Sequence, residues 1–153
     1  MFVSRRFSRV TLAVCVSMVV AAATSEASHL KDFPTKHRIV YQLSDAGTDR
    51  AKFVLGNLRN HMRGVGSQNI EAVELVVFGP ALKSFVTKTM DPEVRQLLET
   101  LQTLGMTFAA CGNTMKNYSI VLEELPDGTK TLPQGGVVRI MELEDAGYRY
   151  IRP

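Results

Sequence analysis

A single cysteine offers the most specific chemistry in this sequence. Cys111 follows the apolar run 106–110 and directly precedes Gly112, Asn113 and Thr114. This spacing predicts a strand, a sharp turn at the glycine, and then a helix that Asn113 or Thr114 caps. A sulfur at the start of a helix faces unpaired N–H groups and the positive end of the helix dipole, which both favour the thiolate. The sequence therefore predicts a nucleophile for disulfide exchange or attack on persulfide sulfur, or N–H groups that hold an anionic ligand instead.

The alternative for Cys111 is a purely structural role. Free cysteine is among the residue types most often buried, where it packs as a small hydrophobe. The two interpretations differ in one physical property, because a nucleophile must be ionised and accessible at the rim of the sheet.

Motifs of several other catalytic classes are absent from the sequence. No GxGxxG follows the first predicted strand, and GxxxxGK[ST], HExxH, CxxC and GxSxG do not occur. The three histidines, His29, His37 and His61, are scattered along the chain. We therefore expect no metal site and no cofactor.

Other polar or small residues follow the predicted strands. Ser44 and Asp45 come after the first strand and Gly79 comes after the second. The carboxyl ends of parallel strands form the crevice of an open α/β sheet, so we expect these residues to bind a ligand beside Cys111. Asn57 lies four residues before His61 on the first predicted helix, so both share one face. Asn57 is a further ligand-binding candidate, with a polar outer face as the alternative.

The elements that position these residues follow from hydrophobic periodicity. Strands are predicted over residues 38–43, 71–78, 106–110, 129–132 and 148–151, and short helices over 81–87 and 119–125. Longer helices begin at Thr48 or Asp49, which would cap the first, and at Asp91, which would cap the second. The stretch from Val137 to Gly147 favours a helix, with a strand as the alternative. Strands that alternate with helices predict a parallel sheet between helical layers.

The N-terminal segment resembles a secretory signal peptide. Residues 1–9 carry three arginines and no acid, residues 10–23 are apolar or small, and a small polar stretch follows. We expect residues 1–27 to be removed, with cleavage after Ala27 or Ala23. The rival interpretation is an uncleaved membrane anchor, but the apolar span is shorter than the roughly 20 residues that a bilayer core requires.

Cleavage changes the composition of the mature chain. Without residues 1–27, the eighteen basic and fifteen acidic residues become fifteen and fourteen, and Cys15 is lost. This balance gives no basic patch for nucleic acid, and one cysteine forms no internal disulfide. We expect an irregular arm over residues 28–37, one domain over 38–153, and a periplasmic or secreted protein with no membrane contact after cleavage.

Five segments carry a resemblance to a known family. They read IVYQLSDAG, LGNLRNHMRGVG, VELVVFGPALK, LGMTFAACGNTM and GGVVRIMELEDAGYRYIRP. Over residues 38–153 the chain resembles the DsrE/DsrF-like family of small sulfur-relay proteins, in particular its exported branch. The resemblance implies a DsrEFH-like three-layer α/β/α sandwich around a mainly parallel sheet of about five strands. It also implies a homo-oligomer, as a trimer or a hexamer.

The resemblance also implies a role for each residue of the ACGNT segment. In the relay proteins a cysteine carries a persulfide and passes its outer sulfur to a partner protein. Cys111 would be that cysteine, and Gly112, Asn113 and Thr114 would shape its pocket. The best-known relay proteins act in the cytoplasm with sister subunits, whereas this chain carries an export signal, so the sulfur donor and acceptor remain unnamed.

Three functional hypotheses follow. The first is an exported sulfur carrier or sulfurtransferase-like protein with Cys111 as the persulfide site. The second is a non-catalytic oligomeric module that binds a small ligand in a crevice of Ser44, Gly79 and Asn113, with Cys111 as a packing residue. The third is a redox sensor that joins subunits through Cys111.

Overall fold

The computed structural model describes residues 35–153. The predicted signal peptide, Cys15 and most of the predicted arm lie outside the described residues. The strands are β1 (His37–Leu43), β2 (Ile70–Val77), β3 (Met106–Cys111), β4 (Lys130–Leu132) and β5 (Arg149–Ile151). The helices are α1 (Thr48–Val65), α2 (Pro92–Thr103), α3 (Gly112–Tyr118) and α4 (Gly136–Asp145), with 3₁₀ segments at Ser67–Asn69, Gly79–Phe85 and Leu122–Glu124.

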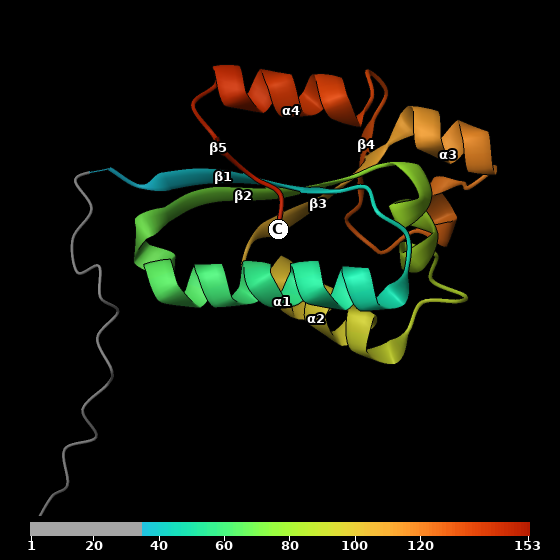
Figure 1. Cartoon of the computed structure of the whole chain (residues 1–153), viewed down its shortest axis with the longest axis horizontal. Helices are drawn as coiled ribbons and strands as arrows, with labels where there is room; N and C mark the ends of the chain where they lie inside the picture. Colours follow the sequence, from blue (N-terminus) through green and yellow to red (C-terminus); the bar gives the residue numbers. More distant parts are fainter. Residues whose placement is uncertain (1–34) are drawn as a thin grey trace, which may run out of the picture.

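The five strands form one sheet in the order β4-β3-β2-β1-β5, and every pairing is parallel. Helices α1 and α2 lie on one face of the sheet and α4 lies on the other (Figure 1). This architecture confirms the three-layer α/β/α prediction. The register pairs Leu43 with Val77, Val77 with Ala110, and Cys111 with Leu132, so four strands end at a common edge.

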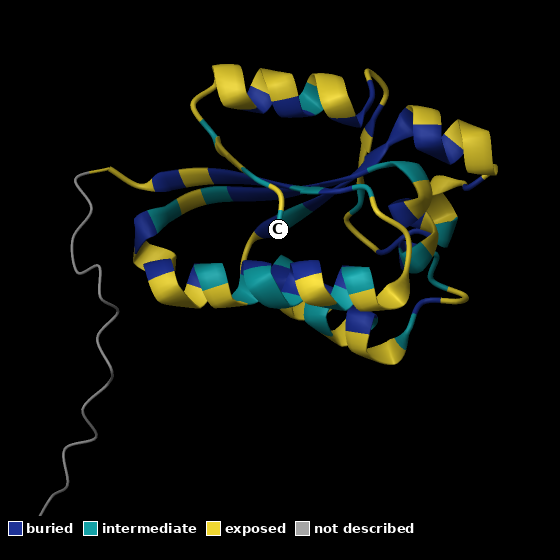
Figure 2. Ribbon diagram, viewed as in Figure 1, coloured by how far each residue is buried: buried dark blue, intermediate teal, exposed yellow. Residues whose placement is uncertain are grey.

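The core has two parts because both faces of the sheet are covered. The larger part packs between the sheet and the helices α1 and α2, and includes the rings of Phe85 and Phe108, whose centroids are 4.9 Å apart. The smaller part lies under α4 and comprises Val40, Val76, Ala109, Leu132, Ile140 and Leu143. Figure 2 shows this division as buried strands with exposed outer helix faces. Strands buried on both faces explain the nearly continuous apolar runs in the sequence.

The helix ends follow the sequence only in part. Asp91 caps α2 as predicted, since its carboxylate accepts hydrogen bonds from the N–H groups of Glu93 and Val94 at 2.9 and 3.3 Å. The cap predicted for α1 is wrong, because Gly47 is the N-cap residue and no side chain caps it. Asp49 lies instead in the first turn, where its charge still complements the helix dipole.

The C-terminal half shows which alternatives were correct. Residues from Val137 onward form a helix rather than a strand, as the periodicity favoured. The short helices predicted over 81–87 and 119–125 are replaced by 3₁₀ turns, and Ser119 ends α3 in the left-handed conformation. No helix within residues 35–153 has the length and apolar character to cross a membrane.

Candidate functional site

Cys111 lines a small pocket at the carboxyl edge of the sheet. It is the last residue of β3 and its exposed fraction is 6%. The pocket has a volume of about 180 Å³ and is enclosed by the end of β2, the first turn of α3 and the start of α4. Its other lining residues are Phe78, Asn113, Thr114, Gln134, Gly135, Gly136, Val137 and Val138.

The starts of two helices converge on the Cys111 sulfur. Asn113 and Thr114 of α3 and Gly136 of α4 line the same pocket as Cys111, and their backbone N–H groups favour its thiolate. The prediction that Asn113 or Thr114 caps α3 is wrong, because the helix already begins at Gly112 and Cys111 is the N-cap residue. The Cys111 side chain makes no capping hydrogen bond to α3, so the first-turn N–H groups act on the sulfur through their dipoles.

This surrounding changes the acidity of the thiol. Burial raises the pKa of Cys111. The Thr114 hydroxyl and the N–H groups of Thr114, Gly136 and Asn113 together lower the pKa by more than burial raises it. The net result is a pKa below the ordinary value of a cysteine thiol. A larger fraction of Cys111 is therefore thiolate at neutral pH than in an unfolded chain.

Thr114 connects the sulfur to the neighbouring strand. Its Oγ1 accepts a hydrogen bond from the N–H of Gly79 at 2.9 Å, and its hydroxyl helps to lower the pKa of Cys111. Gly79 in turn lies against β1, because a Cβ on Gly79 would be 3.5 Å from the carbonyl oxygen of Ser44. The ends of β1, β2 and β3 therefore meet at this edge, as expected from the sequence.

Two glycines allow the close approach of the pocket walls. A Cβ on Gly112 would lie 2.9 Å from the carbonyl oxygen of Leu132, and a Cβ on Gly136 would lie 2.8 Å from Cδ1 of Phe78. Both distances are shorter than ordinary contacts. The absence of a side chain at these positions therefore brings β4 and the start of α4 within reach of Cys111.

Two predicted ligand-binding residues lie away from the pocket. The carboxylate of Asp45 pairs with Arg50 and Arg152, both at 3.3 Å, and so holds the C-terminal tail against the loop after β1. Asn57 lies on α1, on the opposite face of the sheet from α4, and its amide donates to the carbonyl of Phe53 at 2.8 Å (Figure 1).

Other predicted residues are close to the pocket but contribute through the backbone. The Ser44 hydroxyl accepts a hydrogen bond from Nε2 of Gln42 at 3.3 Å, and only its carbonyl contacts the Gly79 turn. Gly112 does not line the pocket and packs against the backbone of Leu132. Asn113 and Thr114 line the pocket, so the residues implied for the ACGNT segment are brought together.

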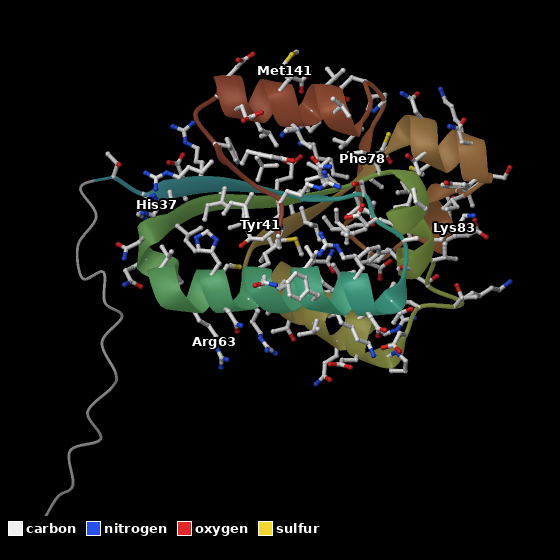
Figure 3. The ribbon with its side chains drawn as sticks, viewed as in Figure 1. His37, Tyr41, Arg63, Phe78, Lys83 and Met141 are labelled. Carbon is white, nitrogen blue, oxygen red and sulfur yellow. The ribbon has the colours of Figure 1, made fainter. Side chains whose placement is uncertain are left out.

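The sequence reasoning missed the wall that α4 provides. Phe78 and residues 134–138 complete the pocket, and Figure 3 shows Phe78 near the start of α4. The pair Gly135-Gly136 marks a helix start in the sequence, but nothing local places that helix beside Cys111.

The pocket carries no charged side chain among its lining residues. Lys116 is exposed and lines a separate groove between α3 and the end of β4. The positive potential at the sulfur therefore comes from backbone N–H groups rather than from a cation. Within residues 35–153, no three His, Cys, Asp or Glu side chains are grouped to hold a metal ion.

Comparison with known proteins establishes the fold. The sequence matches no family model and no curated protein. The structure is similar to that of MTH1491, a protein of unknown function from Methanobacterium thermoautotrophicum, with a TM-score of 0.65 and 24% identity over 77% of this chain and 100% of that chain. It is also similar to the YchN protein from E. coli, with a TM-score of 0.58 and 19% identity over 78% of this chain and 99% of that chain. These likenesses show that the chain shares its α/β fold with both proteins.

Proposed function

We propose that this protein is an exported sulfur carrier in which Cys111 holds a persulfide. The observation that supports the proposal best is the convergence of two helix starts on the Cys111 sulfur inside a pocket. The DsrE-like fold and the ACGNT segment support it as well. The proposed export rests on the sequence of residues 1–27, which lie outside the described residues.

The proposed reaction is a pair of thiol–persulfide exchanges. The Cys111 thiolate attacks the outer sulfur of a donor persulfide, the new sulfur–sulfur bond forms, and the donor thiolate leaves as its own bond breaks. An acceptor thiolate then attacks the outer sulfur on Cys111, and the Cys111 thiolate leaves. Neither step needs an added oxidant or reductant. The N–H groups from α3 and α4 favour both steps, because they stabilise the same thiolate as nucleophile and as leaving group.

Intact-mass measurement tests the proposal directly. After incubation with a low-molecular-weight persulfide, the mature protein is expected to gain about 32 Da, the mass of one sulfur atom, at its thiolate. A reductant should remove the added mass. The Cys111→Ser variant is the matched control and should gain nothing. An equal gain in that variant would refute the proposal.

The same preparation separates the carrier from a ligand-binding module. The module is favoured by one observation, the low exposure of Cys111. If Cys111 is a packing residue, iodoacetamide should modify it only after denaturation, and the folded protein should not accept sulfur. If it is the persulfide site, both reactions should occur in the folded protein at neutral pH.

We also propose that the protein self-associates through the outer face of α4. Val137, Val138 and Met141 are exposed there at 67%, 40% and 56%, and Figure 3 shows Met141 pointing away from the sheet. Neighbouring exposed apolar side chains are typical of association surfaces. We expect Met141→Glu to lower the molar mass that light scattering measures. Phe53→Glu, a charge at an isolated exposed residue on α1, should not change it. A wild-type monomer, or an unchanged mass for Met141→Glu, would contradict this proposal.

A further inference from the structure

A buried ion pair joins helix α4 to the sheet, in addition to the small apolar core that packs under the helix. Glu74 lies in the middle of β2 and is 5% exposed. Nε and Nη2 of Arg139 donate to the two carboxylate oxygens of Glu74, each at 2.8 Å. This is the bidentate geometry in which an arginine fixes both the distance and the orientation of its partner.

The ion pair is costly unless its geometry is nearly ideal. Removing a carboxylate and a guanidinium from water carries a large desolvation penalty, and apolar residues of similar size often stabilise a fold equally well. A buried pair therefore contributes more to the position of the elements than to their net stability. Lys130 of β4 adds a second contact to Glu74 at 3.5 Å, but its side chain is 44% exposed.

Arg139 connects this pair to the pocket. Its backbone N–H bonds the carbonyl of Gly135 at 3.1 Å, so Arg139 belongs to the first turn of α4. Gly136, three residues earlier, lines the pocket together with Cys111, and its N–H favours the thiolate. A fixed guanidinium therefore fixes the height of this N–H above the sheet, because one helical turn moves as a unit.

A second route runs through Glu142 to the pocket wall. Nη1 of Arg139 contacts a carboxylate oxygen of Glu142 at 3.4 Å, and Nε2 of Gln134 donates to the same carboxylate at 3.0 Å. Gln134 lines the pocket around the sulfur. The buried carboxylate on β2 is thus joined through Arg139 and Glu142 to Gln134 in the loop that precedes α4.

We propose that Glu74 and Arg139 are positioning residues whose ion pair holds the first turn of α4 against the Cys111 sulfur and thereby governs its reactivity. The consequence for sulfur transfer rests on the function proposed above. The consequence for the ionisation of the thiol does not rest on that function, because it depends only on where the N–H of Gly136 lies relative to the sulfur.

The test compares two carboxylates of the same strand. Glu74→Gln removes the buried charge, whereas Glu71→Gln removes a charge that pairs with Arg38 at 3.4 Å on the surface. The ultraviolet absorbance of the Cys111 thiolate against pH gives its pKa, and iodoacetamide gives its rate of alkylation. We expect Glu74→Gln to raise the pKa of Cys111 by about one unit. At a pH below the pKa, this change lowers the thiolate fraction, and with it the alkylation rate, about tenfold. Glu71→Gln should behave as wild type.

A double variant keeps the test decisive if Glu74→Gln folds poorly. Glu74→Leu with Arg139→Met replaces the pair by apolar side chains that pack under α4. We expect this protein to unfold at a similar denaturant concentration to wild type but to retain a less reactive thiol. A double variant with wild-type thiol titration and alkylation would overturn the proposal.

The outcomes also distinguish this inference from the proposed function. If wild type accepts no sulfur while the Glu74 variants still shift the thiol titration, the carrier function fails and the positioning role stands. If wild type accepts sulfur while the Glu74 variants titrate as wild type does, the positioning role fails and the carrier function stands.

Discussion

Replacing Thr114 by valine is expected to raise the pKa of Cys111 and to destabilise the fold by about 1–3 kcal/mol, the usual cost of an unpaired buried polar group. Valine has the same shape but no hydroxyl. Cys111 then loses the donor that the Thr114 hydroxyl supplies, and the N–H of Gly79 loses its acceptor at 2.9 Å. Denaturant unfolding measures the loss of stability. Thiolate absorbance against pH measures the change in the pKa of Cys111.

The direction of this change with pH follows from the sign of the shift. The pKa of Cys111 lies below its ordinary value in the folded protein, so the thiolate is the form that the fold stabilises. That contribution to stability is present above the unfolded pKa and is lost as the pH falls through the folded pKa. Thr114→Val should bring the folded pKa of Cys111 closer to its unfolded pKa. The variant then gains less stability from the thiolate, so its deficit relative to wild type should grow as the pH rises.

Thr114→Ser is the matched control, because serine keeps the hydroxyl and loses only a methyl group. Its thiol should titrate close to wild type and should accept sulfur at a similar rate. A Thr114→Val protein that titrates as wild type does would mean that the backbone N–H groups alone determine the acidity of Cys111. The hydroxyl would then have only a structural role toward Gly79.

The order of strands and helices could be predicted from the sequence because its signals are local. The apolar run of β2 predicts a strand covered on both faces, and the side chain of Asp91 with the following proline predicts a helix start. The parallel sheet then follows from the alternation of the elements. The cap at α1 was not predictable in this way, because Gly47 forms it without any side-chain contact.

The candidate site could be predicted only where it is contiguous in the chain. The segment from Cys111 to Thr114 carries its own turn and helix start, so its position at the sheet edge was foreseen. The N–H of Gly136 comes from a distant segment, and no local pattern places it beside the sulfur. Glu74 is one of two acids in β2, and its partner Arg139 is recognisable only once α4 has docked.

Asp45 and Asn57 show the opposite limitation. Both are polar; Asp45 follows the first predicted strand, and Asn57 lies on the helix after it, on one face with His61. The structure gives each of them a partner of its own, an arginine pair for Asp45 and a helix carbonyl for Asn57. Residue type and position in the sequence therefore did not place these two side chains in the pocket, because each has a partner elsewhere.

Replacing Gly112 by alanine is expected to destabilise the fold by about 1–3 kcal/mol through overpacking, and to reduce sulfur loading strongly. The new Cβ would lie 2.9 Å from the carbonyl oxygen of Leu132 and 3.3 Å from Cα of Pro133. Both are backbone atoms, so no side-chain rotation relieves the contact. Since Leu132 pairs with Cys111, the strain must be relieved by moving β4 away from β3.

This movement would open the pocket from the side of the loop that follows β4. That loop leads to Gly136, so the N–H that reaches the sulfur would move with it. Denaturant unfolding and intact-mass analysis of persulfide loading measure the two effects. Gly64→Ala is the control, because Gly64 lies within α1 with open space around its Cα, and alanine there should stabilise the helix by about 0.5–1 kcal/mol. If Gly112→Ala is as stable as wild type and loads sulfur equally well, then the proposed loading does not depend on close contact between α3 and the end of β4.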